Sequence, residues 1–237
     1  MDPADGKSEA WHSLEIRSFG RRRGRKLSAR QERLLAELLP RVGVDLSQPS
    51  PSNLASLFPP GTSAVWLEIG FGGAEHLMWQ ARENLGVGLI GCEPFEEGVV
   101  KALAAIEDGG LGNVRLHCDD VRPLIRWLPE RSVSRVFMLF PDPWPKKRHQ
   151  KRRLFSVDLL NLLARVMVPG AELRLATDIG DYARTALRAV AQTPAFRWTA
   201  EGPADWRVRP PDWPETRYEA KAGREGRRCY FFRFIRG

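Results

Sequence analysis

The feature that most constrains the fold of this chain is a regular alternation of short apolar runs with longer helical patterns, which begins at Ala64. The runs are rich in apolar and β-branched residues, and they predict strands at 64–69, 87–92, 114–118, 133–140 and 172–176. Helical patterns follow from about residue 75 and at 96–107, 122–127, 154–168 and 181–192. This alternation is typical of an α/β fold in which helices cover both faces of a parallel sheet.

The last part of the chain is expected to close that sheet. Two further strands are predicted at 196–200 and 229–236, which would bring the sheet to seven strands, most of them parallel. The stretch 201–228 between these two strands is interpreted as a loop. We place the main domain at 61–237 and assign 1–60 to a flexible basic arm, a helix and a linker.

The arm contains residues 16–27, which read IRSFGRRRGRKL and carry six cations and two glycines. Such a segment cannot bury an apolar core, so it is expected to be flexible until a partner orders it. It could be a solubility tail. Because Phe19 lies among the arginines, we favour contact of Arg21, Arg22 and Arg23 with nucleic acid.

A helix and a linker are predicted between the arm and the main domain. The helix is expected at 28–39, where Ser28 and Gln31 have the spacing of a capping box and Pro40 would end the helix. The stretch 48–60 is rich in Pro and Ser and predicts a linker that runs over the surface.

The composition limits the kind of protein and the kind of partner. A chain of 237 residues with 43% hydrophobic residues is typical of a globular protein with a full core, and its net charge of +8 favours a polyanionic partner. The three cysteines lie far apart with no histidine at metal-ligand spacing, so neither a metal site nor a disulfide framework is expected. No apolar run is long enough for a membrane span, and a cytoplasmic location is expected.

The stretch 133–153, VSRVFMLFPDPWPKKRHQKRR, joins the fourth predicted strand to a dense run of positive charge. Its three prolines forbid a continuing strand or an immediate helix, so Asp142 and Trp144 are expected in a stiff turn. Six cations follow within eight residues: Lys146, Lys147, Arg148, Lys151, Arg152 and Arg153. Such a run is often only a solvated face, but beside an acid and an indole it favours nucleic-acid binding.

Acidic residues stand at or near the ends of the first five of the seven predicted strands. They are Glu68, Glu93, Asp120, Asp142 and Asp178. Ligands of open α/β sheets bind outside the carboxyl ends of the strands, so these acids predict a ligand site. A purely structural network would need a matched partner for every acid, because five neighbouring carboxylates would otherwise repel each other.

The turn after the first strand, LEIGFGGAEH, indicates a nucleoside cofactor. Gly70 and Gly72 let the backbone approach a ligand, and Glu93 follows at the usual distance for an acid that binds both ribose hydroxyls. Such an acid suits NAD and S-adenosylmethionine equally. Asp120 would suit an adenine amino group, and Glu68 favours S-adenosylmethionine because its ammonium group needs an anion.

Several of these motifs together resemble the bacterial tRNA (guanine-N7-)-methyltransferases. They are LEIGFGG at 67–73, FPDPWPKKRHQKRR at 140–153, Thr177-Asp178, TRYE at 216–219 and the arm IRSFGRRRGRK at 16–26. The resemblance covers about residues 16–237, and the PDPWPKKRH block is highly specific to that family. It implies a Rossmann-like class I fold and methylation of the variable-loop guanosine at tRNA position 46 with S-adenosylmethionine, without an obligatory protein partner.

The resemblance also implies roles for individual residues. Glu68, Glu93 and Asp120 would bind S-adenosylmethionine, and Asp142 would lie at the reaction centre. The substrate would be contacted by Lys146, Asp178, Thr216, Arg217, Tyr218 and Glu219. Ala74 stands where the family often has a third glycine, and Arg217-Tyr218 replaces the more usual Lys-Phe pair.

Three alternatives stay open at this stage. The first is another Rossmann-like methyltransferase that modifies an adenine or a protein. The second is a non-catalytic RNA-binding protein, which the intact set of acids disfavours. The third is a nicotinamide-dependent oxidoreductase, which Glu68 and the basic block disfavour.

Overall fold

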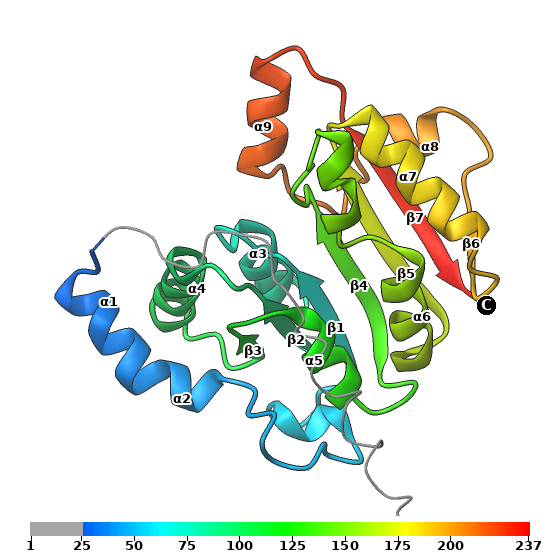
Figure 1. The fold of residues 1–237 in the computed structure, drawn as a ribbon. Coiled ribbons are helices and arrows are strands. Elements are labelled where there is room, and N and C mark those ends of the chain that lie inside the picture. Colours follow the sequence, from blue (N-terminus) through cyan, green and yellow to red (C-terminus); the bar gives the residue numbers. More distant parts are fainter. Residues whose placement is uncertain (1–25) are drawn as a thin grey trace, which may run out of the picture.

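The structure of the chain is a computed structural model that describes residues 26–237 (Figure 1). Seven strands within these residues form one sheet in the order β3-β2-β1-β4-β5-β7-β6. The strands are β1 (Ala64–Ile69), β2 (Val87–Cys92), β3 (Val114–His117), β4 (Val133–Leu139), β5 (Met167–Thr177), β6 (Phe196–Trp198) and β7 (Tyr230–Arg236). The first five strands are parallel, and β7 is antiparallel to both of its neighbours. The predicted α/β fold is therefore confirmed, and the predicted RNA contacts of Arg21, Arg22 and Arg23 lie outside the described residues.

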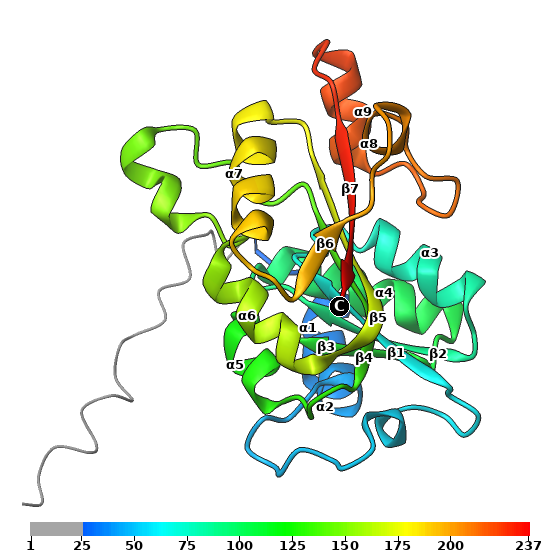
Figure 2. The same ribbon diagram turned by 90° about the vertical axis from the view of Figure 1, so that its right-hand side faces the viewer.

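Helices cover both faces of the sheet, as the alternation predicts (Figure 2). The helices α5 (Val121–Trp127), α6 (Val157–Val166) and α7 (Gly180–Ala191) bury their apolar sides against one face. On the other face α3 (Glu75–Glu83) and α4 (Glu96–Gly109) pack against β2 and β3. Strands that are covered on both faces read as nearly continuous apolar runs, which explains why β1 and β2 could be predicted residue for residue.

The strand boundaries differ from the prediction at two places. The strand β3 ends at His117, so Cys118, the last residue of the predicted strand, lies outside it and is exposed. The strand β5 begins at Met167, earlier than expected, because Met167 pairs with Val133 before a register shift. Pro169 and Gly170, which precede the predicted strand, lie within this irregular part of β5.

The segment before the main domain is helical beyond the predicted end. It consists of α1 (Ala29–Arg33), the π-helical turn η1 (Leu34–Leu38) and α2 (Leu39–Val42). Ser28 and Gln31 form the predicted capping box. Pro40 does not end the helix, because the proline falls at the start of α2, just after the wider π turn, where its missing N–H costs least. Leu34 and Val42 join the apolar cluster of α3 and α4.

Two predictions of unstructured segments were wrong. The expected surface linker contains the 3₁₀ turn η2 (Leu54–Leu57), and Leu54 and Phe58 are buried in the core. The expected loop at 201–228 contains α8 (Ala204–Arg207) and α9 (Arg217–Arg224). None of the helices in the described part of the chain has the length and hydrophobicity that a membrane crossing needs.

Candidate active site

The candidate site lies at the carboxyl ends of β1, β2 and β4. The chain runs outward from β1 through β2 to β3, and then returns to the other side of β1 for β4 and β5. This reversal of strand order beside β1 is the topological switch point at which open α/β sheets bind ligands. All five predicted acids follow or end strands on this side, so the sequence correctly predicts that they gather at one rim.

The glycine-rich turn after β1 is held by Glu93. Gly70 and Gly72 have φ angles of +74° and +55°, which side chains with a Cβ adopt reluctantly. Glu93 Oε2 accepts a hydrogen bond of 2.8 Å from the Gly72 N–H, and its Oε1 accepts one of 3.0 Å from the Phe95 N–H. Burial raises the pKa of Glu93. A Cβ on Gly98 would lie 2.3 Å from the Gly72 carbonyl oxygen, so α4 can pack this close only because that position is glycine.

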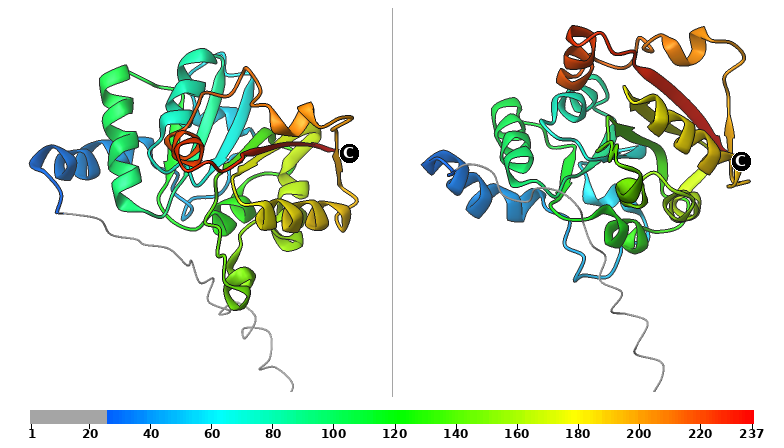
Figure 3. Two further views of the ribbon diagram at one scale, coloured as in Figure 1. Left: turned by 90° about the horizontal axis from the view of Figure 1, so that it is seen from above. Right: turned by 45° about the horizontal axis from the view of Figure 1, so that its top comes forward.

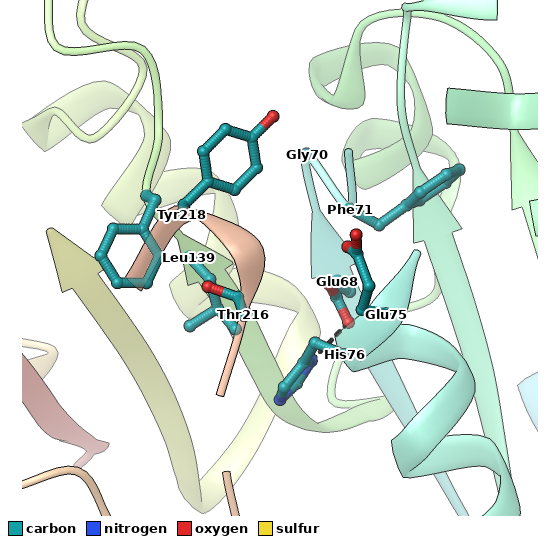
Figure 4. Close-up of a pocket in the computed structure, with 9 residues that line it drawn as sticks. Glu68, Gly70, Phe71, Glu75, His76, Leu139, Thr216 and Tyr218 are labelled. Atoms are coloured by element: carbon teal, nitrogen blue, oxygen red, sulfur yellow. Dashed lines mark hydrogen bonds and ion pairs between the residues drawn. The ribbon is translucent and has the colours of Figure 1, made fainter. Parts of the chain in front are cut away.

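Glu68 is buried at the end of β1, where it is 3% exposed. Its Oε2 lies 2.7 Å from His76 Nδ1, on the first turn of α3 (Figure 4). Both residues line a pocket that also includes Gly70, Phe140 and Tyr218. The sequence pattern singled out Glu68 but not His76, although His76 follows the glycine-rich turn directly.

Asp120 and Asp178 already have partners within the chain. Asp120 accepts hydrogen bonds of 2.9 Å from the Arg122 N–H and of 2.8 Å from Arg122 Nε. Burial alone would raise the pKa of Asp120, but the hydrogen bonds from Arg122 outweigh it and lower that pKa. Asp178 pairs with Arg227 Nε at 2.7 Å. The repulsion among the acids that the sequence suggested is therefore relieved in part by the protein itself.

Asp142 differs from the other four acids. It lies in the turn after β4, and none of the residues from 26 to 237 makes a hydrogen bond or an ion pair with its carboxylate. The loss of water around its carboxyl raises the pKa of Asp142, although the residue as a whole stays exposed at the rim. Asp142 and Asp178 line one cleft together with Tyr218, Lys221 and Arg227. The turn is strained, since Phe140 and Trp144 have φ angles of +52° and +41°.

The basic block after Asp142 divides into exposed and buried cations. Its central part is the 3₁₀ helix η3 (Lys147–Arg152), and the side chains of Lys146, Lys147, Arg148 and Lys151 are exposed. Trp144 is packed within the block, with the Arg152 guanidinium 4.9 Å from its ring centroid and His149 at its edge. The indole is thus covered by residues of its own loop.

Arg153 does not belong with the exposed cations. Its side chain is 2% exposed and pairs with Asp181 Oδ2 at 2.7 Å. It also donates hydrogen bonds of 3.0 Å to the Pro143 carbonyl oxygen and of 2.8 Å to Thr185 Oγ1. A guanidinium with these internal partners is not available to a phosphate, so the prediction that Arg153 contacts RNA needs correction.

Four of the predicted substrate residues, 216–219, lie at the start of α9, and the structure brings Arg217 and Tyr218 to the glycine-rich turn. Figure 3 shows α9 beside α3, although the two are far apart in the sequence, and Arg217 Nε lies 3.6 Å from Glu75 Oε1. Tyr218 packs on Gly72 and stacks on Phe140, with ring centroids 6.4 Å apart. Thr216 caps α9, so this residue has a structural role in the chain.

Glu219 pairs with Arg209 at 3.0 Å. Sequence reasoning also missed Lys221 and Arg227, the cations of the cleft that contains Asp142. No motif marks them, because their place at the site depends on how α9 folds back over the sheet.

Known proteins are similar to this chain over most of its length. A family model described as "Putative methyltransferase" matches residues 62–232. The tRNA (guanine-N(7)-)-methyltransferase of Hyphomonas neptunium is 52% identical over 206 residues, which make up 87% of this chain and 93% of that protein. The protein of the same name from Rhodospirillum rubrum is 47% identical over 225 residues, or 94% of this chain and 88% of that protein.

Solved structures agree on the fold. The 16S rRNA methyltransferase KamB superimposes with a TM-score of 0.58 at 16% identity, covering 80% of this chain and 96% of that chain. TrmN from Thermus thermophilus gives a TM-score of 0.55 at 19% identity, covering 77% of this chain and 47% of that chain. At such identities the likeness shows only the Rossmann-like fold of class I methyltransferases. The family model and the identity to the curated relatives go further, and they show that this chain belongs to the tRNA (guanine-N7-)-methyltransferase family.

Proposed function

We propose that this protein transfers the methyl group of S-adenosylmethionine to N7 of the guanosine at position 46, in the variable loop of tRNA. The observation that carries the proposal is the pair of adjoining clefts, one around Glu68 and one around Asp142, which share Phe140 and Tyr218. The first cleft places the carboxylate of Glu68 beside the glycine-rich turn, as an anion for an ammonium group, and the second contains Asp142, an acid without a partner among residues 26–237. We further propose that the protein acts in the cytoplasm, without an obligatory protein partner.

The residues at the carboxyl ends of β1, β2 and β3 fit S-adenosylmethionine, with Glu68 in the first cleft and Glu93 and Asp120 after the two neighbouring strands. Each carboxylate oxygen of Glu93 accepts one backbone N–H, which leaves a lone pair on each for a ribose diol. Nothing lies within 4 Å of the place that a Cβ on Gly70 would take, so there is room beside the turn. Glu68 would accept from the ammonium group, and Asp120 would accept from the adenine amino group. When bound, the cofactor supplies a methyl group on a sulfonium centre.

The residues of the second cleft would bind and orient the guanine. N7 of neutral guanine already has a lone pair, so no residue has to act as a base. Asp142 and Asp178 would accept hydrogen bonds from N1–H and from the N2 amino group, and their charge would stabilise the positive charge that develops on the ring. Asp178 would do so while it stays paired with Arg227.

The exposed cations of the basic block would bind phosphates of the tRNA. Lys146 would contact the substrate next to Asp142, and Lys147, Arg148, Lys151 and the half-buried Arg152 would contact the RNA backbone. In the same proposal the first turn of α9 contributes the further substrate contacts, through Thr216, Arg217, Tyr218 and Glu219.

Salt dependence tests the phosphate contacts. In the double variant Lys147→Ala/Arg148→Ala, we expect the slope of log Kd for tRNA against log salt concentration to fall by up to about two. The matched control is Arg126→Ala/Arg131→Ala, which removes two exposed cations from the opposite end of the sheet and should leave the slope unchanged. Equal changes in the two double variants would contradict the proposal.

The pH profile tests the role of Asp142. Burial raises the pKa of its carboxyl, and only the ionised form can stabilise a cationic guanine. The single-turnover rate should therefore fall on acidification at a pH above about 3.9, the usual value for aspartate. Asp142→Asn should remove this acid limb along with most of the activity. An acid limb at or below the usual value, or one that persists in the variant, would count against the assignment.

The activity itself is tested by incubating the protein with methyl-labelled S-adenosylmethionine and an unmodified tRNA transcript. Nuclease digestion should then yield labelled 7-methylguanosine from the variable loop. A transcript with adenosine in place of that guanosine is the control and should stay unlabelled. Label in another nucleoside would overturn the proposed regiochemistry, and tRNA binding without any label would favour a non-catalytic protein.

A further inference from the structure

A buried chain of hydrogen bonds connects Glu68 with the segment that precedes α9. Glu68 Oε2 lies 2.7 Å from His76 Nδ1, and His76 Nε2 lies 3.2 Å from Gln80 Nε2. Gln80 Nε2 in turn donates to the Asp212 carbonyl oxygen at 3.1 Å. The side chains of Glu68, His76 and Gln80 are at most 3% exposed, so their polar atoms depend on each other for partners.

The direction of each hydrogen bond follows from two backbone carbonyls, which can only accept. Asn84 Nδ2 faces the Gln80 carbonyl oxygen at 3.0 Å, so Nδ2 is the donor of that amide, and it also donates to Gln80 Oε1 at 3.0 Å. Gln80 Nε2 faces the Asp212 carbonyl oxygen and is therefore a donor as well. The second hydrogen of Gln80 Nε2 points to His76 Nε2, which has to accept it.

His76 therefore carries its proton on Nδ1 and donates it to Glu68 Oε2. The edge of the Phe137 ring, with centroids 4.6 Å apart, packs against the imidazole and limits its rotation. None of residues 26–237 forms a hydrogen bond with the other oxygen of Glu68, and Glu68 lines the pocket (Figure 4). One oxygen of the carboxylate is thus held in place, and the other stays available to a ligand.

The chain of hydrogen bonds is also anchored at its other end, at Asp212. Arg174 is 3% exposed, and its Nη2 lies 2.7 Å from Asp212 Oδ2. The Arg174 guanidinium also lies 5.4 Å from the ring centroid of Trp213, which is 2% exposed. Thr216 follows shortly afterwards and caps α9. The peptide that Gln80 holds is thus continuous with the residues that pack on the glycine-rich turn.

We propose that His76 and Gln80 are positioning residues for the reaction. His76 orients Glu68 toward the ammonium group of the cofactor, and Gln80 ties that contact to the segment 212–218, whose Thr216 and Tyr218 line the pocket. This inference rests on the proposed function, because the amino-acid part of S-adenosylmethionine supplies the ammonium group. Since Glu68, His76 and Gln80 are buried and joined by hydrogen bonds, a ligand that fixes Glu68 also restrains the segment at the far end of these bonds.

The proposed role of His76 in orienting Glu68 can be tested by calorimetry with two neutral thioethers. S-adenosylhomocysteine has the amino-acid part of the cofactor, whereas 5′-methylthioadenosine lacks it. In His76→Leu we expect Kd for S-adenosylhomocysteine to rise about tenfold and Kd for methylthioadenosine to change less than about twofold. His76→Asn keeps an N–H donor near the position of Nδ1, and it should restore the first Kd to within about threefold of wild type. Equal weakening of both ligands, or no rescue by asparagine, would overturn the inference.

Two further measurements test the chain of hydrogen bonds and do not depend on an activity assay. Nitrogen-15 NMR of the ligand-free protein should show a proton on Nδ1 of His76 and none on Nε2, and a proton on Nε2 would overturn the assignment. Hydrogen exchange should show that S-adenosylhomocysteine protects 213–219 in wild type and protects it less in Gln80→Met. Equal protection in the two proteins would overturn the coupling.

The outcomes also separate this inference from the proposed function. If the wild-type protein binds neither thioether, the proposed cofactor is wrong and this inference falls with it. If the wild-type protein binds both, and His76→Leu loses both equally, only the role of His76 is wrong.

Discussion

Replacing Asp142 by alanine is expected to lower kcat about a hundredfold to a thousandfold and to leave Kd for tRNA within about twofold of wild type. The carboxylate has no partner among residues 26–237, so its removal leaves no unpaired group behind and should not disturb the fold. What is lost is a negative charge beside a ring that becomes positive only as the methyl group moves. Such an interaction is stronger in the transition state than in the bound substrate, and its loss therefore appears in kcat.

The measurement is single-turnover methyl transfer to a tRNA transcript, combined with filter binding of the same tRNA. Asp142→Asn retains the shape and loses the charge, and it should lose nearly as much activity as the alanine variant. Asp158→Ala is the matched control, because Asp158 is an exposed acid on α6 and should be dispensable. Equal losses of kcat and of tRNA affinity would argue against a role for Asp142 at the reaction centre.

Replacing Arg153 by alanine should destabilise the protein by about 2 to 4 kcal/mol. The guanidinium is 2% exposed and ties the turn after β4 to α7 through Pro143, Asp181 and Thr185. The variant leaves the Pro143 carbonyl oxygen without this donor, and it leaves a cavity beneath the basic block. The cost is therefore larger than that of an exposed ion pair.

Urea denaturation measures this loss, and Lys151→Ala is the matched control. Lys151 is an exposed cation only two positions away, so its removal should weaken tRNA binding and leave the urea midpoint unchanged. Arg153→Ala should show the reverse pattern at temperatures where it stays folded. An Arg153→Ala protein that keeps the wild-type midpoint but binds tRNA more weakly would restore Arg153 to the RNA-binding surface.

The fold was predictable from the sequence because its signals are local. Most of the buried strands are short and mainly apolar, most of the turns contain Gly or Pro, and β1 and β2 match their predicted bounds. Since the carboxyl ends of parallel strands meet at one edge of the sheet, the order of the elements already brings Glu68, Glu93 and Asp142 to the same rim.

The individual roles of the charged residues were less predictable. Arg152 and Arg153 are neighbours in one basic run, yet the first stacks on Trp144 and the second is buried against α7. No local pattern separates them, because burial depends on which side of the turn faces α7. The same holds for α9, whose exposed and charged sequence buries only Ala222 and so lacks a clear apolar stripe.

The sequence by itself determined the α/β class, the cofactor-type turn, the acids at the strand ends and the family to which the chain belongs. These depend on residue type and spacing along a few residues, which a single chain displays directly. The tertiary structure alone decided which acids already have partners, which cations face solvent, and how His76 and Gln80 connect Glu68 to Asp212. Those contacts join residues up to 132 positions apart, and only the packing of α3 against the segment before α9 brings them together.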